Sequence, residues 1–293
     1  MTRVLLLGAN GQLGVDVRRL AEGRRGIELC ALTRADLDLA DLDETRRRLA
    51  GLDFDALINA TGYHKTDEVE RNAERAVLIN AYAPKTLAEI CLAKGARLVH
   101  LSTDYVFGGQ AKREPLTEAD PPAPVNVYGA TKLMGEALIF AAGADALVAR
   151  VSSLYGVAGA SGKGGNFVET MIRLAREKGA LRVVDDQVMA PTATADVAEA
   201  LLRAIEAKPP AGLYHVVGSG QASWFEFAKA IVAGAGLGGV PVEPVPSSAM
   251  PTPARRPAYS ALSNGKLTQT LGWTMPVWRE SLERYLRAKG HKG

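Results

Sequence analysis

Residues 4–14 read Val-Leu-Leu-Leu-Gly-Ala-Asn-Gly-Gln-Leu-Gly, an apolar run followed at once by glycines spaced Gly-x-x-Gly-x-x-Gly. The run Val4–Leu7 is typical of a buried parallel strand, and an amphipathic helical pattern begins at Gln12. Glycines at such a turn let the backbone approach a diphosphate, and the helix N-terminus offers free N–H groups. The stretch predicts a dinucleotide-binding loop, although similar turns also arise for steric reasons alone.

The rest of the first half alternates short apolar runs with longer amphipathic segments. Such alternation requires right-handed crossovers and gives a parallel sheet covered on both faces. We therefore expect an α/β fold built on a doubly wound, Rossmann-like parallel sheet. The predicted strands are Val4–Leu7, Ile27–Leu32, Ala56–Asn59, Arg97–Leu101 and Ala146–Arg150, and the predicted helices are Gln12–Ala21, Asp43–Leu49, Ala73–Lys94 and Tyr128–Ala141.

The pattern loosens after about residue 150, which suggests a second part of the chain. We assign residues 1–150 to a dinucleotide-binding domain, with segments at about 185–215 returning to it. Residues 151–293 would mainly form a smaller C-terminal substrate-binding lobe. Helical patterns within it cover Phe167–Lys178 and Val277–Ala288, and the proline-rich stretch 241–257 is expected to be a loop or the edge of a lid.

Composition excludes several classes of protein. The chain has 293 residues, 47% of them apolar and 23% charged, as in folded globular proteins. A net charge of +3 is too small to indicate a nucleic-acid partner. No stretch approaches the roughly 20 apolar residues of a membrane span. Cys30 and Cys91 both lie in apolar patterns, so we expect them buried in a cytoplasmic protein, and two cysteines cannot make a zinc site.

The end of the second predicted strand bears on the choice of dinucleotide. An Asp or Glu about 20 residues past the glycines would read the ribose 2′-hydroxyl of NAD. That region is Leu32-Thr33-Arg34, and Arg34 can instead pair with a 2′-phosphate. We therefore expect NADPH to be preferred, with NADH possible. Arg34 as a solvated loop residue is the alternative, and Asp36 or Asp38 could reverse the preference after a loop shift.

Tyr128 and Lys132 lie four residues apart, on one face of a predicted helix. This geometry suits acid–base catalysis, because a nearby ammonium lowers the pKa of a phenol. The spacing alone is weak evidence, since Tyr285 and Lys289 repeat it in the last helix. That second pair lacks a glycine loop and a hydroxyl-bearing strand end, so we interpret it as a surface coincidence.

Ser102-Thr103-Asp104 supplies the context that favours the first pair. The three residues follow a predicted strand, at the edge where open α/β sheets place their ligands. A hydroxyl there can hold a carbonyl oxygen beside Tyr128. The alternative is that Ser102 and Thr103 merely end the strand.

These motifs resemble the extended short-chain dehydrogenase/reductase superfamily, and more closely the dTDP-4-dehydrorhamnose reductase family. The resemblance covers nearly the whole chain. Its features are the Gly8–Gly14 loop, Asn59-Ala60-Thr61, Asp67 with Glu70, Asn80, Ser102-Thr103-Asp104-Tyr105-Val106-Phe107, the approach Glu118–Pro124, Asn126-Val127-Tyr128-Gly129, Lys132, Gly135-Glu136, Leu154-Tyr155-Gly156, Gly165-Asn166-Phe167, Asp186-Gln187, Ala190-Pro191-Thr192 and Arg256-Pro257.

The resemblance implies NAD(P)H-dependent reduction of the 4-keto group of a dTDP-linked 6-deoxyhexulose, yielding dTDP-L-rhamnose. Thr103, Tyr128 and Lys132 would be the catalytic set, in a monomer or homodimer, with Mg²⁺ possible and no metal-binding residues assigned. Tyr128 and Lys132 would also contact the cofactor, together with Gly8, Asn10, Gly11, Gln12, Leu13, Asp38, Leu39, Ala60, Thr61, Tyr63 and Asn80. Substrate contacts would come from Ser102, Asp104, Val106, Phe107, Leu154, Asn166 and Arg256.

Several departures from the family pattern lie near the expected sugar site. Ser153 stands where the family commonly has Trp, Gly108-Gly109 replaces Asp-Gly, and Met189 replaces a glycine. A small polar run is replaced by Gly62-Tyr63-His64-Lys65-Thr66, in which His64 is either a new substrate ligand or a solvated residue. Arg255-Arg256 could grip a diphosphate or form a solvated turn. These changes affect the identity of the sugar more than the redox chemistry.

Three rival functions come from the same resemblance. A nucleotide-sugar dehydratase typically carries Asp-Glu after the threonine, whereas here Tyr105 follows Asp104, which argues against elimination. A reductase or epimerase of another nucleotide sugar stays open. The methionine adenosyltransferase beta subunit also resembles this family and is a regulatory subunit, so a non-catalytic NADP-binding partner is the alternative outside enzymes.

Overall fold

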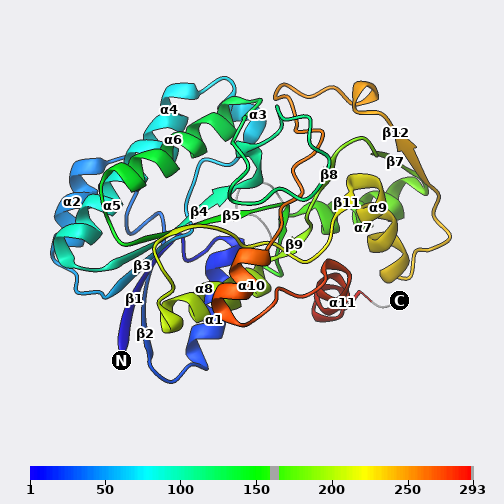
Figure 1. The fold of residues 1–293 in the computed structure, drawn as a ribbon. Helices are drawn as coiled ribbons and strands as arrows, with labels where there is room; N and C mark the ends of the chain where they lie inside the picture. Colours follow the sequence, from blue (N-terminus) through cyan, green and yellow to red (C-terminus); the bar gives the residue numbers. More distant parts are fainter. Residues whose placement is uncertain (159–164, 292–293) are drawn as a thin grey trace.

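A six-stranded parallel sheet forms the centre of the molecule (Figure 1). The computed structural model describes residues 1–158 and 165–291. The strand order is β10-β5-β4-β3-β1-β2, so it reverses between β1 and β3. The α/β fold with a doubly wound sheet is thereby confirmed. The strands are β1 (Thr2–Leu7), β2 (Ile27–Leu32), β3 (Ala56–Asn59), β4 (Arg97–Thr103), β5 (Ala146–Val151) and β10 (Gly212–His215).

Helices cover both faces of this sheet. Alternate residues of β1 point into different cores: Val4 and Leu6 into one, Leu5 and Leu7 into the other. On the first face lie α1 (Gln12–Glu22), α8 (Thr194–Ala207) and α10 (Gly265–Leu271), and on the second α2 (Leu42–Ala50), α5 (Ala83–Lys94) and α6 (Val127–Ala141). Each fully buried Leu or Ile side chain stabilises the fold by roughly 2 kcal/mol.

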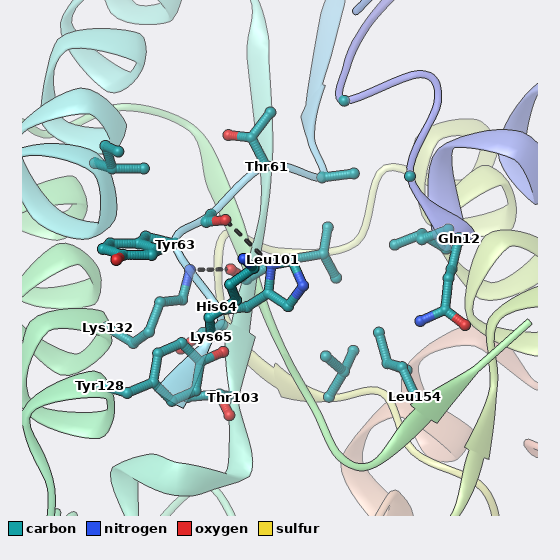
Figure 2. A pocket seen from close by; sticks show the side chains of 18 of the residues that line it. Gln12, Thr61, Tyr63, His64, Lys65, Leu101, Thr103, Tyr128, Lys132 and Leu154 are labelled. Carbon is teal, nitrogen blue, oxygen red and sulfur yellow. Dashed lines mark hydrogen bonds between the residues drawn. The ribbon is translucent and has the colours of Figure 1, made fainter. Parts of the chain in front are cut away.

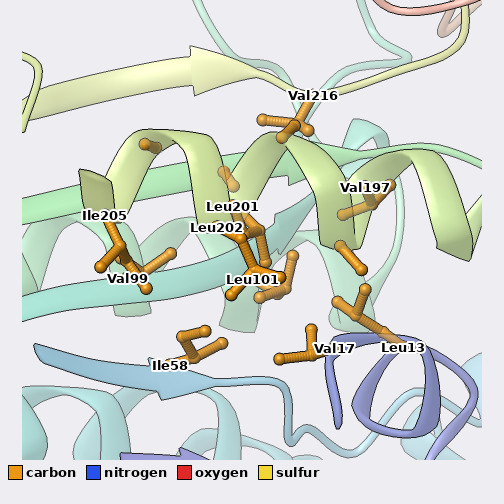
Figure 3. Packing of buried hydrophobic residues seen from close by; sticks show 14 of the residues in the cluster. Leu13, Val17, Ile58, Val99, Leu101, Val197, Leu201, Leu202, Ile205 and Val216 are labelled. Atoms are coloured by element: carbon orange, nitrogen blue, oxygen red, sulfur yellow. The ribbon is translucent and has the colours of Figure 1, made fainter. Parts of the chain in front are cut away.

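The first face is held mainly by α8 and α1 (Figure 3). Val197, Leu201 and Ile205 recur at helical spacing along α8 and pack over the sheet residues Val99 and Leu101. Leu13 and Val17 of α1 contribute to the same cluster. Because α1 starts at the glycine loop, its packing against the sheet fixes the position of that loop.

The predicted helix Ala73–Lys94 is a single helical run with a π turn inside it. The run consists of α4 (Ala73–Val77), the π turn η1 (Leu78–Tyr82) and α5. Pro84 has no N–H to donate to the carbonyl of Asn80, which favours the wider turn at that point. By length and composition the run Ala73–Lys94 could cross a membrane, but half of its most apolar window is buried inside the protein, as in a core helix.

A second hydrophobic cluster lies beyond the carboxyl ends of the sheet strands. Tyr155, Phe227 and Trp278 form its aromatic centre. The helices around it are α7 (Phe167–Lys178), α9 (Trp224–Gly234) and α11 (Trp278–Ala288), with the paired strands β7 (Leu181–Val184) and β12 (Val242–Val245). The short elements are α3 (Thr66–Val69), η2 (Asp104–Val106), β6 (Leu154–Tyr155), β8 (Val188–Met189), β9 (Thr192–Ala193), β11 (Ala222–Ser223) and η3 (Ser247–Ala249).

Two local expectations were wrong. The proline-rich stretch is not wholly a loop, because it contains β12, in which Pro244 pairs with Val183 of β7. Cys30 is exposed rather than buried, whereas Cys91 is buried as expected. Cys30 is exposed because β2 is an edge strand of the sheet, so the residues of β2 are not all covered.

Candidate active site

A cavity of about 860 Å³ opens at the carboxyl ends of β1, β3, β4 and β5 (Figure 2). The reversal of strand order between β1 and β3 lies at this edge, where open α/β sheets bind their ligands. Figure 2 shows Thr103, Tyr128 and Lys132 on one side of the cavity, with Gln12 and Leu154 across from them. Phe167 and Trp224 from α7 and α9 complete the lining, so both parts of the chain contribute to it.

The glycine loop forms a cradle that side chains would close. Gly8 has a φ of +87°, a conformation that favours glycine. A Cβ at Gly14 would lie 2.2 Å from the carbonyl oxygen of Gly8, so only glycine allows α1 to start this close to the loop. Within the described residues no side chain caps the N-terminus of α1 at Gly11. Its N–H groups face the cavity and fit a diphosphate.

Tyr128 and Lys132 are one turn apart on α6. Asn126 caps this helix by accepting a hydrogen bond from Gly129 N at 2.8 Å. A Cβ at Gly129 would lie 2.0 Å from the carbonyl oxygen of Tyr105, so this glycine lets α6 approach the segment that follows Thr103. The local sequence thus brings Tyr128 beside Thr103.

The electrostatics of Tyr128 differ from the expectation. Burial raises the pKa of Tyr128 to about 12, with a hydrogen bond to Thr103 opposing the rise. The expected lowering of this pKa by the Lys132 ammonium is therefore wrong. The spacing does not reveal how deeply the phenol is buried, and burial decides the direction. Burial also lowers the pKa of Lys132 to about 8.

A buried hydroxyl and carboxyl network supports the floor of the cavity. Asp104 accepts hydrogen bonds from Ser260 at 2.6 Å and Ser152 at 3.0 Å. Burial raises the pKa of Asp104 to about 6, and these hydroxyls oppose the rise. Ser102 donates a hydrogen bond to Glu136, which also accepts from Nε of Arg150 at 2.9 Å and from its Nη2 at 2.7 Å. Ser102 and Asp104, on either side of Thr103, are therefore held by side chains from three separate segments.

Arg34 lies at the far end of the cavity, beyond the glycine loop. Its guanidinium forms an ion pair with Asp38 at 2.9 Å. Burial raises the pKa of Asp38, but hydrogen bonds from Ala40 and Arg34 lower it on balance. Arg75 also lines this end, so two arginines face the region where Asp38 lies.

Most of the residues singled out from the sequence line this one cavity. Lining it are Gly8, Asn10, Gly11, Gln12, Leu13, Arg34, Asp38, Leu39, Ala60, Thr61, Tyr63, His64, Ser102, Thr103, Asp104, Tyr128, Lys132, Leu154 and Asn166. Four others, Asn80, Val106, Phe107 and Arg256, are not part of the lining.

The residues outside the lining have contacts of their own. Asn80 binds the backbone of Tyr63 from behind, accepting from its N–H at 2.8 Å and donating to its carbonyl at 3.1 Å. Val106 and Phe107 are fully buried in a hydrophobic cluster. Arg256 is paired with Asp67 at 2.9 Å. A sequence motif reveals which residues recur together but not which of them face the cavity.

Several residues that line the cavity were not assigned to the site from the sequence. They include Lys65, Arg75, Tyr105, Phe167 and Trp224. Trp224 lies 74 positions beyond Arg150, the end of the last predicted strand. Its ring centroid lies 4.6 Å from that of Phe167 because α7 and α9 pack together. Lys65 belongs to residues 62–66, which depart from the family pattern. That departure near the expected sugar site could have indicated that Lys65 lines the cavity.

The interpretation of Tyr285 as a surface residue was wrong. Its side chain is buried. The phenol donates to Glu169 at 2.7 Å and accepts from Asn166 Nδ2 at 3.1 Å. Asn166 in turn lies 3.4 Å from the Gln12 amide oxygen, within the glycine loop. The apolar face of α11 packs on the second hydrophobic cluster. The helical pattern of the sequence predicted such a buried face, but the interpretation of Tyr285 and Lys289 as a surface pair did not take it into account.

A metal site has no support in the described part of the chain. Within residues 1–158 and 165–291 no three His, Cys, Asp or Glu side chains are grouped so as to hold a metal ion.

Comparisons with known proteins cover nearly the whole chain. A family model described as the RmlD substrate binding domain matches residues 1–290. Spore coat polysaccharide biosynthesis protein SpsK of Bacillus subtilis is 38% identical over 99% of this chain and 98% of its own length. The dTDP-4-dehydrorhamnose reductase of Mycolicibacterium smegmatis is 39% identical, over 96% and 84%. A crystal structure of dTDP-4-dehydrorhamnose reductase from Bacillus anthracis in complex with NADP has a TM-score of 0.89 and 35% identity, covering 98% of this chain and 99% of that one.

Proposed function

We propose that this chain, which belongs to the dTDP-4-dehydrorhamnose reductase (RmlD) family, reduces the 4-keto group of dTDP-4-dehydrorhamnose to give dTDP-L-rhamnose. The observation that carries the proposal is the meeting of the glycine cradle with Thr103, Tyr128 and Lys132 in one cavity. The relatives that share 37–39% identity over nearly the full chain include reductases with this activity in their names.

The cofactor we propose is NADPH, which would supply a hydride to the keto carbon. The diphosphate would lie on the N-terminus of α1, where Gly8, Gly11 and Gly14 leave room for it. Arg34 would release Asp38 in part and pair with the 2′-phosphate, with Arg75 close by. This arrangement favours NADPH over NADH without excluding NADH. The NADP complex of a relative supports the same choice.

The residues of this chain would then complete the reduction. Thr103 would hold the carbonyl oxygen, since its hydroxyl lies beside the phenol of Tyr128. Tyr128 would donate its proton to the developing alkoxide, and Lys132 would hold the ribose. The raised pKa of Tyr128 keeps the phenol protonated near neutral pH, which is the form that an acid needs.

The nucleotide end of the substrate would lie toward the second part of the chain. Phe167 and Trp224 form an aromatic pair, 4.6 Å between ring centroids, and both line the cavity. Such rings can pack against a pyrimidine base. In this proposal the pair replaces the aromatic side chain that Ser153 lacks. We accordingly assign residues 1–150 mainly to the cofactor and 151–293 mainly to the substrate.

The test is loss of nicotinamide absorbance with dTDP-4-dehydrorhamnose generated in situ, with NADPH and NADH assayed in parallel. Substrate-dependent oxidation of NADPH, and dTDP-L-rhamnose as the product by mass spectrometry and NMR, would support the proposal. Tight NADPH binding without oxidation would contradict it. In that case oxidation with UDP-linked or GDP-linked keto-sugars would identify another substrate, and a stoichiometric protein partner would identify a regulatory subunit.

A further inference from the structure

The inference concerns His100, a fully buried residue of β4 that the proposed mechanism does not use. Its ring lies between two side chains. Nδ1 is 3.0 Å from Nδ2 of Asn59, and Nε2 is 3.1 Å from Nζ of Lys132. Which ring nitrogen carries the hydrogen follows from the partners on each side.

The orientation of the Asn59 amide is fixed independently of His100. Its Oδ1 accepts hydrogen bonds from the backbone N–H of Thr61 at 3.1 Å and from the Thr61 hydroxyl at 2.6 Å. A backbone N–H can only donate, so this end of the amide must be the oxygen. The other end is therefore the NH₂ group, and it donates to His100.

Nδ1 of His100 must then accept, so the hydrogen of the neutral ring is on Nε2. Complete burial lowers the pKa of His100 well below its usual value, with the Lys132 charge adding to this, so the ring is neutral. The Nε2–H group points at Nζ of Lys132. An ammonium has three hydrogens and no acceptor, so it would face this N–H donor to donor.

An uncharged amine at Lys132 satisfies every contact. Its lone pair accepts from Nε2–H of His100, and its own hydrogen goes to the carbonyl oxygen of Leu101 at 2.5 Å. We propose that His100 is a positioning residue whose Nε2–H disfavours the ammonium form of Lys132 and so makes its proton easier to lose. Asn59 and Thr61 act through His100 by fixing its tautomer.

The surroundings of Lys132 agree with this assignment. Burial lowers its pKa to about 8, and Glu136, one turn further along α6, opposes the shift. Glu136 is already engaged by Arg150 at 2.7 Å, which limits its effect. In the described part of the chain, other titratable groups on this side include Tyr128 on α6 and, after β4, Asp104 and Tyr105. The side chains of Tyr63, His64, Lys65 and Glu68 line the same cavity. Lys132 can therefore gain or lose a proton close to neutral pH.

Nuclear magnetic resonance tests the tautomer directly. The full-length protein, with ¹⁵N in its histidine rings, has four histidines: His64, His100, His215 and His291. The missing signal in a His100→Phe variant identifies His100, and variants of the other three identify it by elimination should that variant not fold. We expect a bare Nδ1 and a protonated Nε2 from pH 6 to 8. A protonated Nδ1, alone or with Nε2, would overturn the proposal.

A second experiment inverts the tautomer. In Asn59→Asp a carboxylate oxygen would accept from Nδ1–H of His100, leaving Nε2 to accept from a Lys132 ammonium. This arm rests on the proposed function, because its readout is the pH profile of kcat/KM for the reductase. In the wild type kcat/KM should fall above about pH 8, as the ammonium beside Tyr128 is lost.

In Asn59→Asp this fall in kcat/KM, the alkaline limb of the pH profile, should occur about one pH unit higher, because the Lys132 ammonium gains an acceptor. The matched control is Asn72→Asp, the same change at an exposed residue, which should leave the limb in place. If the His100 tautomer switches in Asn59→Asp but the alkaline limb of the kcat/KM profile stays in place, the link from His100 to Lys132 is contradicted. An inactive wild type would instead contradict the proposed function, and the NMR result would still decide the tautomer.

Discussion

The phenol of Tyr285 accepts a hydrogen bond from Asn166 Nδ2 at 3.1 Å, although 119 positions separate the two residues. Asn166 also donates to the carbonyl of Gly156 at 3.0 Å and reaches the Gln12 amide oxygen. Gln12 accepts from Gly156 N at 2.9 Å. The last helix is therefore linked through two side chains to the loop where we place the diphosphate.

Replacing Tyr285 with Phe should weaken ligand binding. The ring would stay in its buried site, but Asn166 and Glu169 would each lose a partner, at a cost of about 1 kcal/mol. We expect the KM for NADPH to rise about fivefold with kcat nearly unchanged. Tyr259→Phe is the matched control, because it removes a hydroxyl bound to Gln221 outside the cavity. Unchanged KM values in Tyr285→Phe would mean that the link does not position the loop.

Replacing Tyr128 with Phe should remove most turnover, because the phenol that hydrogen bonds to Thr103 and would protonate the alkoxide is lost. Loss of a general acid typically costs 10²–10⁴-fold in rate, and we expect about that reduction in kcat. NADPH should still bind, as measured by its fluorescence. The exposed Tyr82 provides a control, since Tyr82→Phe should keep full activity. An active Tyr128→Phe enzyme would refute the assignment of the acid.

Replacing Arg34 with Gln should reduce the preference for NADPH. A charge-assisted hydrogen bond to the 2′-phosphate at an exposed position is worth about 1 kcal/mol, so the KM for NADPH should rise several-fold. The KM for NADH should change little, because NADH has no 2′-phosphate. Steady-state kinetics with both cofactors would check this. An equal effect on both would indicate that Arg34 only maintains the loop through Asp38.

Asp104 should make stability fall with rising pH. Its pKa in the folded protein, about 6, exceeds its ordinary 3.8, so the folded state binds this proton more tightly than the unfolded state. The contribution is full below about pH 4 and is lost as the pH rises through 6. Between pH 5 and 7.5 the loss should be about 1 kcal/mol.

Urea denaturation at both pH values would measure this change. The difference in unfolding free energy between the two pH values should be smaller in Asp104→Asn, whatever the substitution does to absolute stability. An identical pH dependence in the two proteins would mean that Asp104 does not titrate in this range.

The sequence was sufficient for features that depend on short-range pattern. The Gly8–Gly14 spacing and the apolar runs predicted the parallel sheet, and the Tyr128–Lys132 spacing predicted their shared helix face. The sequence pattern does not show where a residue lies in the folded protein. Cys30 occupies a strand like the others, but its exposure depends on β2 being at the sheet edge.

The same limit applies to the site. Phe107 belongs to a recognisable motif yet points into the core, because η2 turns the chain after Thr103. Trp224 carries no local signal for the cavity, since only the packing of α9 against α7 brings it there. The pKa of Tyr128 depends on the surrounding burial, which no spacing of residues encodes.

The π turn at Leu78–Tyr82 also sets the rotational phase of the helical run. One residue adds about 100° of rotation, so α4 and α5 present different faces than an unbroken α-helix would. Asn80 lies within this turn and holds the backbone of Tyr63. A deletion of one residue here would leave the composition of the helix almost intact yet turn that amide away from the cavity wall. The length of this segment is therefore as much a part of the site as the identity of its side chains.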